Sequence, residues 1–304
     1  MSEQFPSNSF PDSLKGVKIG VTAKNLCTQN ALGLVIGQSS RGLFLRLPSD
    51  WIIYLSEEEW PGPLTLILTD SQGRLQRIEQ GEQAQIHSWG IEFLNQGLVI
   101  DITQAQVWQA TPPTANAFPL AEIKSRLVDL IEHLQVGRSN RDLEQLLNRI
   151  QQSKINLHID EAKTESYLIP TLSDAQQNSP DQVIKACEVL LGRGSGLTPA
   201  GDDIILGLLL AFRRWGSILY PMPDLKKVLL EVPQAAHMKT TTLSANLIEC
   251  ASQGQADLRL IQALDGLITG QPDLDICAEY LADWGSSSGV EVLCGIGAVL
   301  AAGI

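Results

Sequence analysis

The pattern of apolar and polar positions changes near residue 110. Before that point, short apolar runs are separated by Gly, Pro and Asp, which is typical of β-strands joined by turns. The predicted strands are residues 16–23, 43–55 (interrupted by a turn at 48–50), 64–69 and 98–103. This punctuation predicts a mainly antiparallel, small barrel-like β domain.

After residue 110 the apolar positions follow helical spacing. The transition holds three prolines within residues 111–119, so a linker is expected there, with a β-rich domain over 1–118 and a helical domain over 119–304. The predicted helices are residues 121–134, 140–152, 181–191, 199–215, 224–234, 240–251, 255–267, 273–284 and 290–301. The expected fold class is therefore α+β, with an all-helical C-terminal domain.

Composition and charge narrow the range of partners. The chain has 304 residues, of which 44% are hydrophobic, enough for a sizeable core. Its net charge is -12, which repels phosphate backbones and anionic lipid headgroups, so neither nucleic acid nor a membrane is expected as a partner. The polar start of the chain does not resemble a signal peptide, and the most apolar run, the nine residues 204–212, is shorter than the roughly 20 residues of a membrane span. We expect a cytoplasmic protein.

Cysteine and histidine give no catalytic or metal-binding pattern. The five cysteines include no C-x-x-C pair, and the four histidines form no H-E-x-x-H motif. The cysteines are best interpreted as reduced thiols in the core.

The most informative segment is residues 192–203, GRGSGLTPAGDD. Its glycines indicate a loop that turns sharply, and Thr198 followed by Pro199 is a good helix start. The helix that follows is apolar on all sides, so its N-terminus, with free N–H groups and the positive end of the dipole, is expected to be buried and to bind an anion. The segment lacks the G-K-[ST] ending of a P-loop. The candidate substrate-binding residues here are Arg193, Gly194, Ser195, Gly196, Thr198 and Gly201.

Two acidic residues, Asp202 and Asp203, lie in the first turn of this helix. In one interpretation they only complement the helix dipole, which is worth about 0.3–1 kcal/mol each. In the other, one of them binds Mg²⁺ or orients a substrate amide. The preceding glycines and the apolar helix favour the second interpretation.

Two later segments also combine hydroxyl residues with a helix start. Residues 239–244 read KTTTLS, and residues 285–289 read GSSSG. They either cap and connect helices or line a site, with Lys239 supplying positive charge. If the three helix starts converge, they form a positive pocket inside an acidic protein. The further candidates from these segments are Lys239, Thr241, Ser244, Ser287, Ser288 and Gly289.

At GRGSGLTPAGDDIILGLLLAF the chain resembles the AllH family, whose hallmark is a G-x-G-x-G-L-T-P-x-G-D-D segment that opens an apolar helix. The T-x-L-S stretch at 241–244 and the S-S-G stretch at 287–289 also resemble family features. So does the order of a β-rich part followed by a helical part.

The resemblance implies a subunit of oxamate carbamoyltransferase in allantoin degradation, a branch of purine catabolism. That enzyme converts oxalurate and phosphate into oxamate and carbamoyl phosphate, uses Mg²⁺, and needs other subunits. Our own mechanistic hypothesis places a metal site at Asp202 and Asp203, and assigns catalysis to these two residues with Lys239. This sequence has neither the usual carbamoyltransferase S-x-R-T signature nor a histidine in the GSSSG loop. Two alternatives stay open: another Mg²⁺-dependent enzyme acting on a phosphate or carboxylate metabolite, and a non-catalytic anion-binding subunit.

Overall fold

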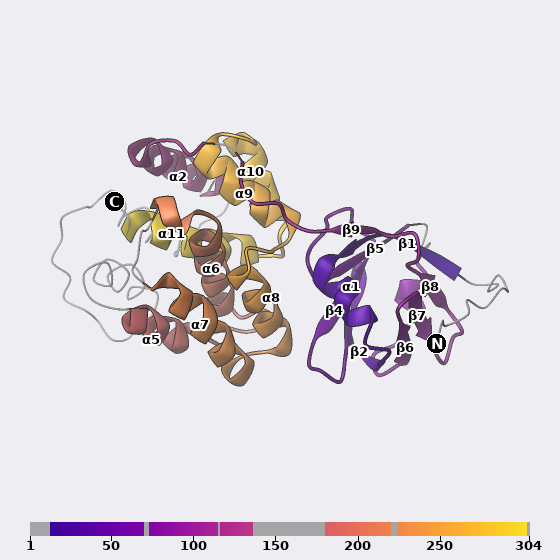
Figure 1. The fold of residues 1–304 in the computed structure, drawn as a ribbon. Coiled ribbons are helices and arrows are strands. Elements are labelled where there is room, and N and C mark those ends of the chain that lie inside the picture. Colours follow the sequence, from indigo (N-terminus) through magenta and orange to yellow (C-terminus); the bar gives the residue numbers. More distant parts are fainter. Residues whose placement is uncertain (1–12, 70–72, 115, 136–179, 220–223, 303–304) are drawn as a thin grey trace. The chain divides into compact units, whose positions relative to one another are not determined.

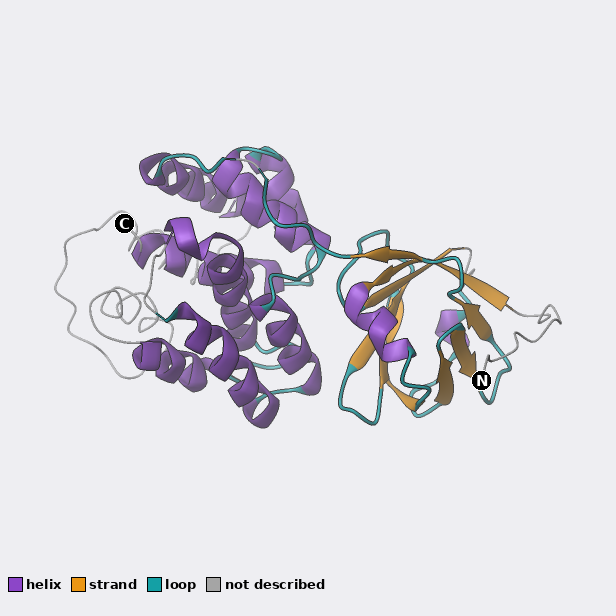
Figure 2. Ribbon diagram, in the orientation of Figure 1, coloured by secondary structure: helices purple, strands orange, loops and turns teal. Residues whose placement is uncertain are grey.

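A computed structural model describes residues 13–69, 73–114, 116–135, 180–219 and 224–302. The chain divides into two compact units, Met1–Gln109 and Ala110–Ile304. The first is built mainly of strands and the second of helices (Figures 1 and 2).

Strands dominate the first unit. Eight of them close into a barrel in the order β5-β4-β3-β2-β6-β7-β8-β1, because β1 also pairs with β5, and β9 lies beside β1. Their bounds are β1 (Ser13–Gly20), β2 (Leu32–Ser39), β3 (Gly42–Arg46), β4 (Ile52–Ser56), β5 (Thr65–Thr69), β6 (Gln83–His87), β7 (Gly90–Phe93), β8 (Val99–Asp101) and β9 (Gln106–Trp108).

The barrel is mixed but mainly antiparallel. Only the pairs β1–β8, β1–β9 and β4–β5 are parallel among the described strands. Alternate residues along the strands, such as Ile53 and Leu55 on β4, point into the apolar interior and are fully buried. The predicted barrel-like β domain is confirmed.

The strand expected over 16–23 was wrong at its end. The chain leaves β1 at Gly20 and forms helix α1 (Val21–Cys27). The reason is a helical period in the burial, since Ala23, Leu26 and Cys27 lie on one buried face. A one-turn 3₁₀ helix, η1 (Leu75–Arg77), follows β5.

The second unit is helical throughout the part that the structure describes, as expected. Its elements are α2 (Leu120–Gln135), α5 (Pro180–Leu190), α6 (Ala200–Leu219), α7 (Leu225–Lys239), α8 (Thr242–Ser252), α9 (Leu258–Thr269), α10 (Leu274–Asp283) and α11 (Ser288–Ala302). The helix predicted over 140–152 lies outside the described residues. The helix predicted to end at 234 instead continues to Lys239, because its buried face extends through Ala235 and Ala236. Pro233 lies inside this helix.

The core of this unit is the contact between α6 and α11. A Cβ on Gly207 would lie 2.0 Å from the carbonyl oxygen of Val292, and a Cβ on Gly295 would lie 1.9 Å from that of Ile204. The two backbones therefore touch, and only glycine fits at these positions. Within the described ranges, no helix is both long and apolar enough to cross a membrane.

Residues that follow the β unit are held by the helical unit. The Ala110 N–H donates to Gln255 Oε1 at 2.9 Å, and the Phe118 N–H donates to the Ile268 carbonyl at 2.9 Å. The domain boundary expected after residue 118 stays a prediction.

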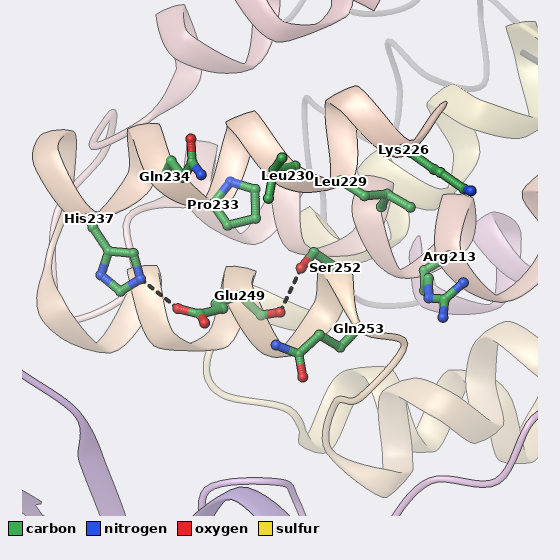
Figure 3. Close-up of a pocket in the computed structure, with 10 residues that line it drawn as sticks. All are labelled: Arg213, Lys226, Leu229, Leu230, Pro233, Gln234, His237, Glu249, Ser252 and Gln253. Atoms are coloured by element: carbon green, nitrogen blue, oxygen red, sulfur yellow. Dashed lines mark hydrogen bonds and ion pairs between the residues drawn. The ribbon is translucent and has the colours of Figure 1, made fainter. Parts of the chain in front are cut away.

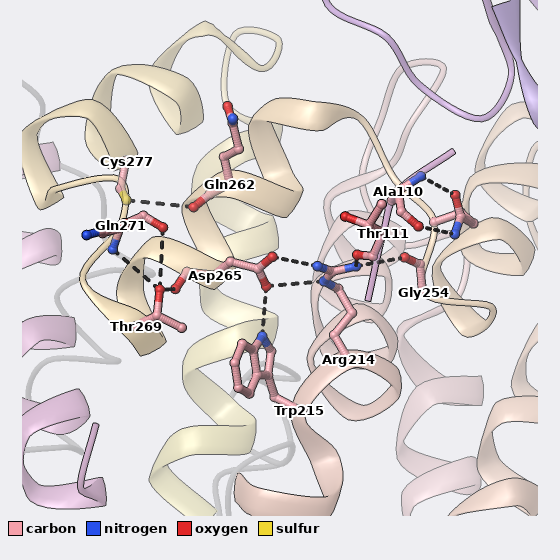
Figure 4. A network of polar contacts seen from close by, with 11 residues as sticks. Ala110, Thr111, Arg214, Trp215, Gly254, Gln262, Asp265, Thr269, Gln271 and Cys277 are labelled. Carbon is pink, nitrogen blue, oxygen red and sulfur yellow. Dashed lines mark hydrogen bonds and ion pairs between the residues drawn. The ribbon is translucent and has the colours of Figure 1, made fainter. Parts of the chain in front are cut away.

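A partly buried ion pair also fastens this segment (Figure 4). The Arg214 guanidinium lies 2.5 Å from Asp265 Oδ2 and donates to the Thr111 carbonyl at 3.0 Å. The Trp215 indole N–H donates to the same aspartate at 2.8 Å. Arg214 is only 4% exposed, so its charge depends on Asp265 for compensation.

Candidate functional site

The glycine loop folds back onto the start of α6. Gly192 and Gly194 have φ angles of +74° and +116°, which side chains on L-residues rarely adopt. The loop is closed by the Gly201 N–H, which donates to the Arg193 carbonyl at 2.9 Å. The helix begins at Ala200, so Thr198 and Pro199 precede it.

Hydrogen bonds join this loop to the two later segments. The Leu197 carbonyl accepts from Thr241 Oγ1 at 2.6 Å and from Ser244 Oγ at 3.5 Å, at the start of α8. The hydroxyl oxygens of Thr198 and Ser288 lie 3.4 Å apart, at the start of α11. The starts of α6, α8 and α11 therefore lie together, although they are separated by tens of residues in the sequence.

Asp202 joins the segments of this cluster through hydrogen bonds. It is 1% exposed, and its Oδ1 accepts from the Gly192 N–H at 2.8 Å. Its Oδ2 accepts from the Thr240 hydroxyl. Both carboxylate oxygens are thus engaged, and they link the glycine loop, α6 and the connection between α7 and α8.

Asp203 lies in a different environment. It is 2% exposed, and burial raises the pKa of its carboxyl from 3.8 to about 7. The nearby charges of Glu291 and Asp202 raise the pKa further, whereas hydrogen bonds from Ser288 and Thr198 lower it. Near neutral pH this carboxyl therefore exists in both protonation states, which suits a group that gives or takes a proton.

The rest of the glycine loop is open to solvent. Residues 192–197 are all exposed, among them the predicted Arg193 and Ser195. Within the part of the chain that the structure describes, the backbone N–H groups of Gly194, Ser195 and Gly196 donate no hydrogen bond. They are available to an anion.

Not all predicted residues lie in this cluster in the same way. The Lys239 ammonium donates to Glu188 Oε2 at 3.0 Å on the surface, so its catalytic role stays a prediction. Gly201 and Gly289 serve close packing, because a Cβ there would lie 2.2 Å and 1.9 Å from backbone carbonyl oxygens. Ser287 is exposed, and its carbonyl accepts from the N–H groups of Val290 and Glu291.

Two residues of the cluster, Thr240 and Glu291, are not among the candidates named from the sequence. Thr240 binds Asp202, and Glu291 is a buried acid beside Asp203. Glu291 had a recognisable signal: Ser288 and Glu291 form an S-x-x-E pattern, which is typical of a helix start. Thr240 lies in the KTTTLS segment, but nothing in that pattern indicated its contact with Asp202, which lies 38 residues away in the sequence.

The carboxylates of the cluster limit how it could hold Mg²⁺. Among the described residues, no group of three or more His, Cys, Asp or Glu side chains is arranged to hold a metal ion. Mg²⁺ usually takes one or two carboxylates and several waters. Asp202 accepts hydrogen bonds from Gly192 and Thr240, and Asp203 accepts them from Ser288 and Thr198, so the metal-binding role of both aspartates stays a prediction.

All three converging segments lie within a stretch that resembles one known family. Residues 190–300 match the family model of oxamate carbamoyltransferase subunit AllH. The AllH resemblance expected from the sequence is confirmed over this stretch, which begins at the end of α5 and includes nearly all of α11. The β unit lies outside the match. Neither a curated protein nor a solved structure matches the chain.

Proposed function

We propose that this chain is a carbamoyltransferase subunit that binds a small anionic substrate where α6, α8 and α11 begin. The observation that carries the proposal is the set of hydrogen bonds joining Leu197 to Thr241 and Thr198 to Ser288, inside the AllH-like stretch. Converging helix N-termini supply N–H donors and positive potential for an anion.

The proposed substrates follow the family name and its resemblance: oxalurate and phosphate on one side, oxamate and carbamoyl phosphate on the other. A phosphate oxygen forms a bond to the carbamoyl carbon, and the bond from that carbon to the oxamate nitrogen breaks. The negative charge that develops on the carbonyl oxygen needs fixed donors. The exposed N–H groups of Gly194, Ser195 and Gly196 fit this role, with Arg193 and Lys239 proposed to attract the anions.

The departing oxamate nitrogen needs a proton, and Asp203 is proposed to supply it. A carboxyl with a pKa of about 7 is protonated in part of the molecules at neutral pH. Because Asp203 is buried beneath half-buried Thr198 and Ser288, the proton would pass through one of their hydroxyls. In the reverse direction the Asp203 carboxylate takes the proton from oxamate.

Mg²⁺ is a second proposed role for the same residue. Asp203 would hold the ion with help from waters, and the bound ion would neutralise charge on the substrate phosphate. It would have to displace the Asp203 proton, so Mg²⁺ binding should tighten as the pH rises from 6 to 8. An Asp203 side chain that binds the ion cannot donate its proton in the same step.

The test uses the full chain co-purified with its partner subunits, which are proposed to include other carbamoyltransferase subunits. Oxalurate phosphorolysis is followed as release of carbamoyl phosphate, with and without Mg²⁺. The Asp203→Asn variant should lose activity by about a hundredfold or more, as expected for removal of a general acid or base. The Ser288→Ala variant should lose less, because Thr198 remains.

The matched control is Glu122→Gln, which changes an exposed acidic side chain in the first turn of α2, outside the three converging segments. It should keep most of its activity. Full activity of the Asp203→Asn variant would contradict the catalytic role. A complex that shows no oxalurate phosphorolysis, although its chain binds oxamate at this place, would favour another enzyme that acts on a phosphate or carboxylate metabolite.

A further inference from the structure

A separate cavity of about 540 Å³ lies between α6, α7 and α8 (Figure 3). Its apolar lining comes from α7 and includes Leu229, Leu230 and Pro233. None of the hydroxyl-rich or glycine segments of the candidate site lines it. The volume lies within the range of roughly 300–1,000 Å³ that is typical of small-molecule sites.

The cavity carries positive charge in an acidic chain. Arg213 from α6 and Lys226 from α7 are both exposed lining residues, and neither forms an ion pair or hydrogen bond with any residue that the structure describes. Figure 3 shows both at one end of the cavity. Two cations without compensating carboxylates favour an anionic ligand.

The other end of the cavity holds a close histidine–glutamate pair. Glu249 is the acidic residue of the lining, and its Oε2 lies 2.7 Å from His237 Nε2. Figure 3 shows this pair away from Arg213 and Lys226. The charge is therefore asymmetric: one end attracts an anion, and the middle offers apolar surface.

We propose that this cavity binds a small organic anion that has one carboxylate and an apolar body. The carboxylate pairs with Arg213 and Lys226, where an arginine can donate two parallel hydrogen bonds. The apolar body covers Leu229 and Leu230, of which Leu230 is 61% exposed in the free chain. The amide side chain of Gln253, also in the lining, can bind a polar substituent.

Isothermal titration calorimetry of the full chain with 2-naphthoate tests this directly. The expected result is saturable binding with one molecule per chain. The neutral analogue 2-naphthamide should bind at least about tenfold more weakly, because it cannot form the charged hydrogen bonds. Inorganic phosphate, which lacks the apolar body, should not displace 2-naphthoate at equal concentration.

Variants that remove single charges show whether binding depends on the lining of the cavity or on the overall surface charge. Arg213→Gln and Lys226→Gln should each weaken 2-naphthoate binding by about tenfold. Lys185→Gln, which removes one exposed positive charge on α5 outside the cavity, should leave it unchanged. Glu249→Gln removes the negative charge and should strengthen binding.

Three results would overturn the proposal. They are absence of saturable binding at millimolar 2-naphthoate, equal binding of 2-naphthamide, and an equal loss of affinity in the Lys185→Gln and Arg213→Gln variants. Because no variant in this series changes the hydroxyl or glycine segments, the outcome is independent of the proposed carbamoyl transfer.

Discussion

Replacing Asp203 with asparagine should change how stability depends on pH. The native carboxyl has a pKa of about 7, against 3.8 for an ordinary aspartate. Between these values the folded chain binds more protons than the unfolded chain, so the free energy of unfolding falls as the pH rises. The stabilisation is fully present below pH 3.8 and is lost as the pH passes 7.

The size of the effect follows from the shift. A difference of about three pKa units corresponds to roughly 4 kcal/mol over the whole range, at about 1.4 kcal/mol per unit. Between pH 5 and pH 8 the wild-type chain should lose roughly 2 to 3 kcal/mol through this one group. Asparagine has a similar shape and no titration, so the Asp203→Asn variant should lack that part of the decline. Groups whose charges do not interact with Asp203 contribute equally to both proteins and cancel in the comparison, whereas Asp202 and Glu291 do interact with it.

Urea unfolding at several pH values between 5 and 8 provides the measurement. Circular dichroism at 222 nm is a suitable signal, because the helices lie mainly in the unit from Ala110 to Ile304. Asp202→Asn is the control: it disturbs the ties to Gly192 and Thr240 and lowers stability, but it leaves Asp203 to titrate. Parallel pH profiles for wild type and Asp203→Asn would refute the reasoning, since they would mean that the buried carboxyl has an ordinary pKa.

Three further substitutions test the packing and the ties that hold the site. Gly207→Ala should lower the free energy of unfolding by about 1–3 kcal/mol, because the new methyl group meets the α11 backbone, and a drop in urea midpoint would report it. Thr240→Val should lower the free energy of unfolding by about 1–3 kcal/mol, because an Asp202 oxygen loses its hydrogen-bond donor. Thr240→Ser keeps a hydroxyl and should retain most of the stability in the same assay. Arg214→Met should lower the free energy of unfolding by about 3–5 kcal/mol, because Asp265 loses its positively charged partner. Thermal unfolding measures this loss, and an unchanged melting temperature would contradict that role.

The helices could be predicted from the sequence because each long amphipathic run repeats one local signal many times. Strands were harder. Only three or four residues form β7, β8 and β9, and β6 reads QAQIH, where polar residues alternate with short apolar ones. In such short elements the closure of the barrel, rather than the local pattern, decides which residues pair.

The kinds of residue in the candidate site could be predicted, but the contacts between them could not. Glycines and hydroxyls indicated three helix starts, yet nothing local reveals that Leu197 meets Thr241 or that Thr198 meets Ser288. The distinct environments of the two neighbouring aspartates were also hidden. Consecutive residues on a helix point about 100° apart. Asp202 therefore meets Thr240 while Asp203 meets Ser288, and only the packing reveals these partners.

The close contact between α6 and α11 at their glycines controls the relative position of the two helix starts. Gly207 lies seven residues after the first residue of α6, and Gly295 lies seven residues after the first residue of α11. At 1.5 Å per residue, each arm is about 10 Å long. A change of about 10° in the crossing angle would then move one start by nearly 2 Å relative to the other, enough to separate the hydroxyls of Thr198 and Ser288, now 3.4 Å apart. A larger residue at Gly207 or Gly295 would therefore change the spacing of the two helix starts, without any change to the residues that contact a substrate.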